Sequence, residues 1–177
     1  MPKAILSWSG GKDSALALYE IQQAGDYEIL ALLTTITEEY DRSSMHGIRR
    51  PLIEQQAESI GISLEKVLLS PVSSNEEYDA KMREMLERHQ KKGVSTVVFG
   101  DIYLEDVRKY REERLASIGM KAVFPLWGRD TAEMARTFIR QGFSAVITCA
   151  GSSKRSLRRI TRPRRLIRSA TSWRVAE

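Results

Sequence analysis

Short apolar runs alternate with amphipathic segments along most of this chain. The run at 29–35 (ILALLTT) is apolar and β-branched throughout, which is typical of a strand buried on both faces. Leu104, Val107 and Tyr110 instead recur every three residues, which indicates one face of a helix. Extended along the chain, the pattern predicts strands over 4–8, 29–35, 64–69, 95–99, 121–124 and 144–149, and helices over 13–24, 50–60, 75–92, 104–118 and 130–141.

A glycine follows each of the five predicted helices, where a residue in the left-handed conformation commonly ends a helix. These glycines are Gly25, Gly61, Gly93, Gly119 and Gly142. Regular alternation of strands and helices predicts an α/β fold, a doubly wound parallel sheet of five to six strands with helices on both faces. Ligands of such sheets bind beyond the carboxyl ends of the strands, so the loops that follow strands are the first places to search for chemistry.

Composition narrows the class of protein. At 177 residues with 42% hydrophobic and 29% charged residues, the chain is expected to form one globular domain with a buried core. No apolar stretch approaches the ~18 residues of a transmembrane helix, and the N-terminus does not resemble a signal peptide. A single cysteine, Cys149, excludes internal disulfides and is expected to be a packed thiol. The expected location is cytoplasmic.

The charge of the chain, +5 overall, is unevenly distributed. Residues 151–177 hold nine Lys or Arg and one acid, so residues 1–150 are mildly acidic. We therefore divide the chain into a domain over 1–150 and a basic tail over 151–177, for which disorder or an out-of-frame origin is expected.

The strongest chemical signal is the hexapeptide SGGKDS at 9–14, placed between the first predicted strand and the first predicted helix. Two glycines permit a tight turn and a close approach of backbone N–H groups to a ligand. The N-terminus of the following helix adds unpaired donors and a positive dipole end, which together suit phosphate or pyrophosphate. The GxxxxGK[ST] spacing of common P-loop NTPases is absent. The alternative is an ordinary glycine-rich turn capped by Asp13.

Two further loops gather polar residues. In the loop 40–51, His46, Arg49 and Arg50 could bind phosphates or an acidic substrate, or could form a solvated basic loop. Directly after the predicted strand 95–99, Asp101 could coordinate Mg²⁺ or bind a ribose or substrate, and Glu105 could assist it.

A third loop, 125–130, offers Trp127 as the wall of a site, or as a core residue, and Arg129 as a partner for an anion. His89 lies in a highly charged predicted helix and is expected to face solvent. With two histidines and one cysteine in the chain, a dedicated zinc site is not expected.

Taken together, these segments resemble the PP-loop ATP pyrophosphatase superfamily and, within it, the diphthine–ammonia ligase family in its bacterial-type form. The first motif is that of the superfamily, whose members cleave ATP between the α- and β-phosphates. The resemblance covers about residues 3–149 and is carried by 9–14, 45–49 (MHGIR), 99–108 (FGDIYLEDVR) and 125–129 (PLWGR). It implies an adenine nucleotide alpha hydrolase-like (HUP) fold, with ATP and Mg²⁺ as cofactors.

The resemblance also implies a reaction, in which a substrate carboxylate is adenylated with release of pyrophosphate and ammonia then displaces AMP to form an amide. The implied partners are ATP, ammonia and a carboxylate-bearing substrate, and a homodimer is possible. No membrane is expected as a partner, and a nucleic acid is possible but not favoured. The implied catalytic residues are Lys12, Asp13 and Asp101, with Asp101 also on the metal. Residues implied to bind the nucleotide are Ser7, Ser9, Gly10, Gly11, Lys12, Asp13, Ser14 and Gly100, and those implied to bind the acceptor are His46, Arg49, Glu105, Arg108, Trp127 and Arg129.

The chain departs from the family pattern after Gly151, where relatives continue with an acid-containing stretch and a later GENGE-H type motif. Here the sequence becomes arginine-rich. A frameshift in the gene is one explanation of this change, and a basic arm that binds RNA or an acidic partner is another. Two alternative functions stay open: an RNA-modifying PP-loop enzyme, and a nucleotide-binding protein whose catalytic site is incomplete. A non-catalytic nucleotide-binding protein of the same α/β class, such as the universal-stress type, would keep the sheet but not SGGKDS.

Overall fold

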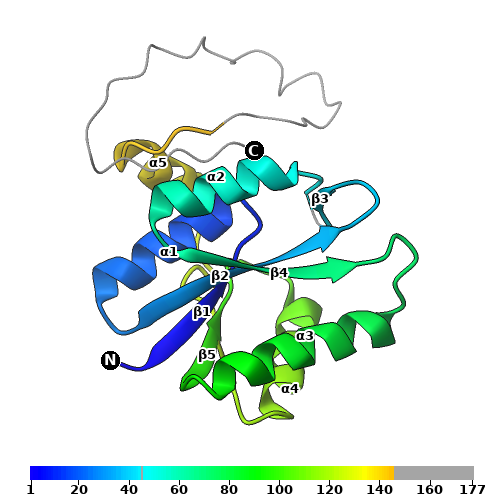
Figure 1. Ribbon diagram of the computed structural model, residues 1–177. Coiled ribbons are helices and arrows are strands. Elements are labelled where there is room, and N and C mark those ends of the chain that lie inside the picture. The colour runs from blue at the N-terminus through cyan, green and yellow to red at the C-terminus, as the bar shows by residue number, and fades with distance from the viewer. Residues whose placement is uncertain (45, 146–177) are drawn as a thin grey trace.

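The computed structural model describes residues 1–44 and 46–145, which form one sheet with helices on both of its faces (Figure 1). Five parallel strands lie in the order β4-β2-β1-β5-β6, and the short β3 pairs antiparallel with the end of β2. The strands are β1 Lys3–Ser7, β2 Glu28–Thr37, β3 Arg42–Ser43, β4 Ser63–Leu69, β5 Val94–Val98 and β6 Lys121–Val123. The helices are α1 Lys12–Ala24, α2 Arg50–Ile60, α3 Asn75–Gln90, α4 Glu105–Ala116 and α5 Thr131–Arg140.

The α/β architecture expected from the sequence is confirmed. All five helices, and the five strands expected between 4 and 124, differ from their expected bounds by two residues at most. The five glycines expected to end helices all have positive φ. The short β3 was not predicted. Residues 146–149 of the strand expected over 144–149, including Cys149, lie outside the described residues. Met45 and the basic tail also lie outside them.

Two apolar layers hold the sheet between its helices. Neighbouring residues of β1 point to opposite faces: Leu6 packs with α1, α2 and α5, whereas Ile5 packs with α3 and α4. Figure 1 shows the same division, with α1, α2 and α5 above the sheet and α3 and α4 below it. No helix within 1–44 and 46–145 is long and apolar enough to cross a membrane.

His89 corrects one expectation, because its side chain is buried (3% exposed) and does not face solvent. It follows Met85 and Leu86 on the face of α3 that is turned to the sheet. Its Nε2 lies 3.4 Å from Glu65 Oε1 on β4. Burial lowers the pKa of His89 below its ordinary value, although Glu65 acts in the opposite direction. The charged composition of the helix concealed a narrow buried face.

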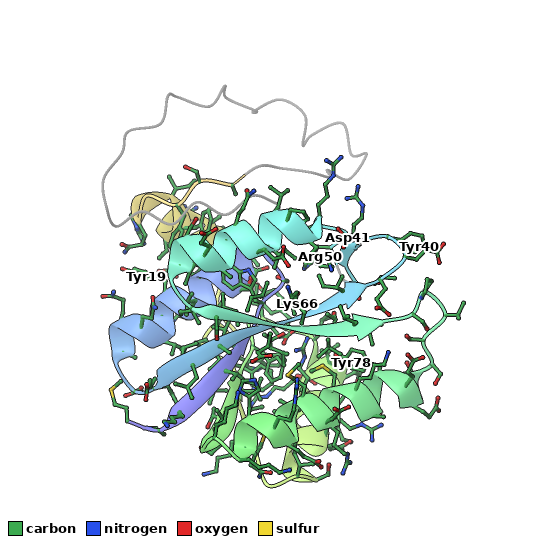
Figure 2. All side chains as sticks on the ribbon, viewed as in Figure 1. Tyr19, Tyr40, Asp41, Arg50, Lys66 and Tyr78 are labelled. Carbon is green, nitrogen blue, oxygen red and sulfur yellow. The ribbon has the colours of Figure 1, made fainter. Side chains whose placement is uncertain are left out.

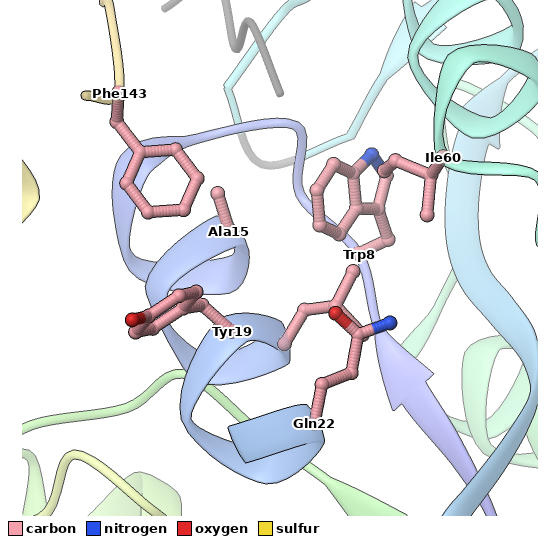
Figure 3. Close-up of a pocket in the computed structure, with 7 residues that line it drawn as sticks. Trp8, Ala15, Tyr19, Gln22, Ile60 and Phe143 are labelled. Atoms are coloured by element: carbon pink, nitrogen blue, oxygen red, sulfur yellow. The ribbon is translucent and has the colours of Figure 1, made fainter. Parts of the chain in front are cut away.

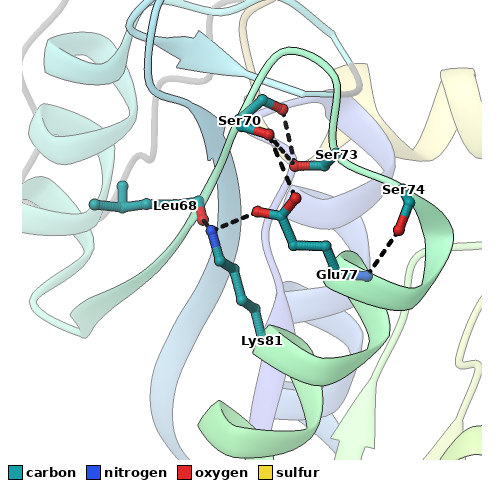
Figure 4. A network of polar contacts seen from close by, with 6 residues as sticks. All are labelled: Leu68, Ser70, Ser73, Ser74, Glu77 and Lys81. Carbon is teal, nitrogen blue, oxygen red and sulfur yellow. Dashed lines mark hydrogen bonds and ion pairs between the residues drawn. The ribbon is translucent and has the colours of Figure 1, made fainter.

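A polar network fixes the start of α3 at the carboxyl edge of the sheet (Figure 4). The Ser74 hydroxyl accepts a hydrogen bond from the Glu77 N–H at 3.2 Å and caps the helix. Lys81 Nζ lies 2.8 Å from Glu77 Oε1 and donates to the Leu68 carbonyl on β4, also at 2.8 Å. The hydrogen bond from Lys81 lowers the pKa of Glu77. The first turn of α3 is thereby tied to the end of β4.

The order of the strands points to where a ligand would bind. From β1 the chain proceeds outward through β2 and β4, then crosses to β5 on the other side of β1 and continues to β6. The connection after β1 therefore leads to α1 on one face of the sheet, and the connection after β5 leads to α4 on the other face. This change of face between neighbouring strands is a switch point, and open α/β sheets bind ligands in the crevice there. SGGKDS follows β1, and Asp101 follows β5.

Candidate functional site

The hexapeptide 9–14 forms the turn after β1 and the first residues of α1, between the strand and the helix as the sequence predicted. Gly10 has φ of +78°, and Gly11 is the N-cap of α1 in an extended conformation, with no side chain capping the helix. The alternative of a turn capped by Asp13 is therefore not what forms, because Asp13 lies inside the first turn. Ser9 Oγ accepts from the Gly11 N–H at 3.3 Å and donates to Ser14 Oγ at 3.2 Å. The result is a compact loop at an uncapped helix N-terminus.

Gln56, on α2, forms hydrogen bonds that hold this loop against α2. The sequence analysis did not identify it. Its Oε1 accepts from the Trp8 indole at 3.1 Å, and its Nε2 donates to the Gly10 carbonyl at 3.2 Å. A Cβ placed on Gly10 would come within 2.9 Å of the same Oε1. The available signal was a polar residue at a core position, since Ile53, Gln56 and Ala57 form the buried face of α2.

The two charged residues of the hexapeptide pair with each other. Lys12 Nζ lies 3.0 Å from Asp13 Oδ2, with about half of the Lys12 side chain exposed (47%). The second oxygen of Asp13, Oδ1, is buried and has no hydrogen-bond partner among the described residues. One carboxylate oxygen thus lies ready for a donor or a cation next to the loop.

The end of β5 approaches the loop through its backbone. A Cβ added to Gly100 would lie 2.9 Å from the Asp13 carbonyl carbon and oxygen and 3.1 Å from the Ser14 nitrogen. The sequence analysis assigned Gly100 to nucleotide binding, and the contact that it makes here is with the backbone of α1. Only glycine permits this approach without displacing the start of the helix.

Asp101, the next residue, is paired with an arginine of α4. Arg111 Nε lies 3.2 Å from Asp101 Oδ2, and its Nη2 donates to Oδ1 at a longer 3.4 Å. The Nε approach is an ion pair without hydrogen-bond alignment, so Oδ2 is buried without a hydrogen-bond partner in the described part of the chain. The Arg111 guanidinium also lies over the Phe99 ring, 4.2 Å from its centroid.

This edge of the sheet offers carboxylates for a magnesium ion but no complete set of protein ligands. Within residues 1–44 and 46–145, no group of three or more His, Cys, Asp or Glu could hold a metal ion. Mg²⁺ usually takes one or two carboxylates together with substrate phosphates. Asp13 Oδ1 and Asp101 Oδ2, both buried and without a hydrogen-bond partner among the described residues, fit that pattern, although Asp101 Oδ2 also lies in the ion pair with Arg111.

The loops after β5 and β6 are bound to each other, which brings two predicted substrate segments together. The Gly128 N–H donates to the Ile102 carbonyl at 2.9 Å, and the Tyr103 hydroxyl donates to the Arg129 carbonyl at 3.0 Å. Arg108 lies over the Trp127 ring, 4.7 Å from its centroid.

Three predicted substrate residues, two at the start of α4 and one in the loop after β6, differ in their partners. Arg108 also bonds Glu112 at 2.8 Å, and Arg129 forms two contacts with Glu20 of α1, at 2.9 and 3.2 Å. Glu105 is exposed in the first turn of α4.

The remaining predicted segment, 46–49, lies on the opposite side of the loop. His46 and Arg49 are exposed, whereas Ile48 reaches inward, with its Cδ1 3.0 Å from a Cβ placed on Gly10. Arg50 pairs with Asp41 at 2.9 Å, and these two residues lie together in Figure 2. Ile48 and Gly100 thus lie against the loop, Arg129 contacts α1 farther along at Glu20, and Arg50 is tied to the hairpin; the substrate roles of these segments stay predictions.

A cavity of about 430 Å³ opens beside the loop, between α3, α4 and the sheet, and the sequence analysis missed it. Its floor consists of sheet residues, namely Ser7, Leu33, Thr35, Val97 and Phe99. Its walls come from α3, with Tyr78, Asp79 and Met82 among others, and from α4, with Val107, Tyr110 and Arg111 among others. Figure 2 shows Tyr78 between α3 and the sheet. Burial raises the pKa of Tyr78, so its hydroxyl stays protonated.

A second hollow lies on the opposite face of the sheet, between α1 and α2 (Figure 3). It is bounded by Trp8, Tyr19, Ile60 and Phe143 among others and has a volume of about 10 Å³. That volume is near the lower limit for a single water molecule, so this hollow is a packing gap.

Comparison with known proteins gives a family match over residues 2–122, to the diphthamide synthase N-terminal domain. Among proteins with curated functions, none is similar enough to count as a match. One similar solved structure is the U34-tRNA thiolase NcsA from Methanococcus maripaludis with its [4Fe-4S] cluster, at 20% identity and a TM-score of 0.43. That match covers 76% of this chain and spans 56% of the thiolase chain. Because the family match extends over more than half of the sequence and includes the SGGKDS loop, the chain belongs to the diphthamide synthase N-terminal domain family of PP-loop proteins.

Proposed function

We propose that this protein is an AMP-forming ligase, which adenylates a carboxylate with ATP and passes the acyl group to ammonia. The single observation that carries the proposal is the SGGKDS loop at the uncapped N-terminus of α1, at the switch point of the sheet. Uncapped N–H groups and the helix dipole suit the pyrophosphate portion of ATP. Membership of the PP-loop family supports cleavage between the α- and β-phosphates.

The reaction would proceed in two balanced steps. A carboxylate oxygen attacks the α-phosphorus, the bond from that phosphorus to the α,β-bridging oxygen breaks, and pyrophosphate leaves with the electron pair. Ammonia then attacks the acyl carbon, the bond to the AMP oxygen breaks, and a proton is released with the amide and AMP.

The residues of the loop would stabilise the charge that develops on the leaving pyrophosphate. The backbone N–H groups at 10–14 would donate to its oxygens, with Gly11 exchanging its bond to Ser9 Oγ, and the half-exposed Lys12 would add a positive charge. Mg²⁺, when bound, would neutralise the phosphate oxygens, and Asp13 and Asp101 are the residues that would hold it. Asp101 would have to exchange part of its ion pair with Arg111 for that role.

The acceptor would be bound by residues of the neighbouring segments. His46 and Arg49 lie on one side of the loop, and Glu105, Arg108, Trp127 and Arg129 lie on the other. Both arginines already have an acidic partner, Glu112 for Arg108 and Glu20 for Arg129. Each would therefore have to exchange that partner for the carboxylate of the acceptor, and Arg108 would do so while lying over the Trp127 ring.

An RNA-modifying PP-loop enzyme is the second candidate, and the observation that favours it is the nine Lys or Arg residues within 151–177. Both candidates use the same loop and release AMP. They differ in the molecule that stimulates this release, which is a carboxylate with ammonia in the first case and an RNA in the second.

The test is to incubate the full chain with ATP labelled at the α-phosphate, Mg²⁺, ammonia and candidate carboxylates, and to separate AMP from ADP. We expect AMP, and ADP as the main product would refute the proposal. Gly10→Val should abolish turnover because the valine would clash with Gln56 and Ile48. Gly119→Val is the matched control, since Gly119 also has positive φ (+73°) but lies away from the loop. Equal loss of activity in both variants would mean that backbone strain, and not the loop, is responsible.

A further inference from the structure

The cavity between α3 and α4 has two ends of different chemistry. Both helices begin at the carboxyl edge of the sheet and run back toward its amino edge, because each follows one strand and precedes the next. At the carboxyl edge the mouth is polar, with Ser7, Ser9, Ser43 and Asn75 on its lining. Farther along the helices the lining is apolar, with Met82, Leu86, Val97, Leu115 and Ile118. A ligand that matches both ends has a polar head and an apolar body.

A polar bridge between the helices covers the side of the cavity that faces away from the sheet. Asp79 on α3 accepts a hydrogen bond from the Tyr110 hydroxyl and lies 2.6 Å from Arg114 Nη2, both on α4. Tyr110 and Arg114 are well exposed, so the bridge lies on the solvent side. The apolar part of the cavity is thus enclosed between this bridge and the sheet, and its polar mouth lies beside the SGGKDS loop.

The charges on the lining favour an anion. Among the described residues, three arginines and one acid line the cavity. Arg114 is paired with Asp79, and Arg111 is paired with Asp101. Arg83 donates to the Ser117 hydroxyl at 3.4 Å and has no acidic partner in the described part of the chain. The lining therefore carries a surplus positive charge, which lies at the apolar end beside Ser117 and Ile118, whereas Arg111, paired with Asp101 after β5, lies toward the carboxyl edge.

We propose that this cavity binds a carboxylic acid with a linear apolar or aryl body, whose carboxylate lies at the serine-lined mouth. The volume of about 430 Å³ falls in the range that encloses small molecules. The side chains of Ser7 and Asn75, which have no hydrogen-bond partner among the described residues, supply donors for the carboxylate. This inference rests on the proposed function, since such an acid placed beside the loop is the acceptor that ATP would adenylate.

The experiment measures binding of hexanoate to the full chain by titration calorimetry, with two comparison ligands. Acetate keeps the charge and lacks the body, and 1-hexanol keeps the body and lacks the charge. We expect hexanoate to bind at least about tenfold tighter than either, a factor that corresponds to roughly 1.4 kcal/mol. Hexanoate binding no tighter than that of acetate or 1-hexanol would overturn the proposal.

A variant that fills the cavity locates the binding. Met82→Trp places a larger side chain on the α3 wall, and we expect it to weaken hexanoate at least about tenfold, since the ligand must then displace a packed ring. Glu84→Trp puts the same residue at an exposed position of the same helix and should leave binding unchanged. Should Met82→Trp fail to fold, Val107→Trp fills the cavity from the α4 wall. Unchanged hexanoate binding in a folded, filled variant would refute the site.

ATP binding and AMP formation, measured on the same samples, separate this inference from the proposed function. ATP binding with AMP formation, in a chain that does not bind hexanoate, would refute the cavity assignment alone. Hexanoate binding that Met82→Trp weakens, in a chain that forms no AMP with any acid, would refute the ligase function and leave the binding site standing.

Discussion

Replacing Gln56 by leucine should weaken the binding of pyrophosphate-bearing ligands out of proportion to those that lack this group. Gln56 holds the Gly10 carbonyl from the side of α2. In a trans peptide, the carbonyl of Gly10 and the N–H of Gly11 point in opposite directions. The hydrogen bond from Gln56 therefore directs the Gly11 N–H away from α2, toward the side on which Ser9 Oγ accepts it. Without Gln56, this peptide keeps the bond from the Gly11 N–H to Ser9 Oγ but loses its anchor on the α2 side, so it rotates more freely.

The magnitude follows from the two contacts that the substitution removes. Each buried partner left without a hydrogen bond costs about 1–3 kcal/mol, and two partners are left, so we expect a loss of about 2–6 kcal/mol in the free energy of unfolding. Ordering one freed backbone unit costs about 1–2 kcal/mol, which corresponds to roughly 5- to 30-fold weaker ATP binding. AMP lacks the β- and γ-phosphates, and its affinity should change less.

The assay is titration calorimetry with ATP and with AMP on four chains: wild type, Gln56→Leu, Gln56→Glu and Trp8→Phe. Gln56→Glu keeps an acceptor for the Trp8 indole but loses the donor to Gly10, so this variant should bind ATP as weakly as Gln56→Leu does. Trp8→Phe removes the indole bond and part of a buried ring but keeps the donor from Gln56 to Gly10, so it should largely spare ATP binding. An equal loss for ATP and AMP, or a greater loss in Trp8→Phe than in Gln56→Leu, would refute this reasoning.

Gly100→Ala should lower the melting temperature and raise the KM for ATP, because its Cβ would lie 2.9 Å from the Asp13 backbone; unchanged values for both would contradict the close approach. Acidification should destabilise the wild type, because burial lowers the pKa of His89 in the fold below the ~6.5 of the unfolded chain, and stability is lost as pH falls below that value. His89→Gln should flatten this part of the pH profile of chemical denaturation, and an unaltered slope would exclude His89 as its cause. Arg108→Met should raise the KM for the acceptor while sparing that for ATP, since Arg108 lies over Trp127 and away from the loop, and a rise confined to the ATP KM would count against that role.

Local signals in the sequence were sufficient for the helices and the parallel strands. Apolar periodicity and terminal glycines act over a few residues, so α2 was expected at 50–60 and lies there. The two-residue β3 carries no apolar run, and backbone hydrogen bonds within its hairpin, such as the one from the Ser43 N–H to the Ile48 carbonyl, hold it in place. Nothing in the local pattern distinguishes such a strand from a loop.

The candidate site was predictable only in part, because some of its features depend on distant partners. SGGKDS and Asp101 follow strands, and their place at one edge of the sheet follows from strand order. The role of Gln56 requires Gly10, which is 46 residues away in the chain. The cavity depends on how far α3 and α4 stand apart, and this separation is set by the width of the sheet and by the bridge at Asp79, not by any segment alone.

The contact between Gly100 and the start of α1 makes the chemistry of Asp13 unusually easy to isolate in experiments. Gly100 meets the backbone of Asp13 and Ser14 there, so the separation between these two segments does not depend on which side chain position 13 carries. Asp13→Asn would keep the size of the side chain and this spacing while removing a charge. A kinetic change in that variant would therefore report the carboxylate itself, free of the displacements that usually confuse substitutions in phosphate loops.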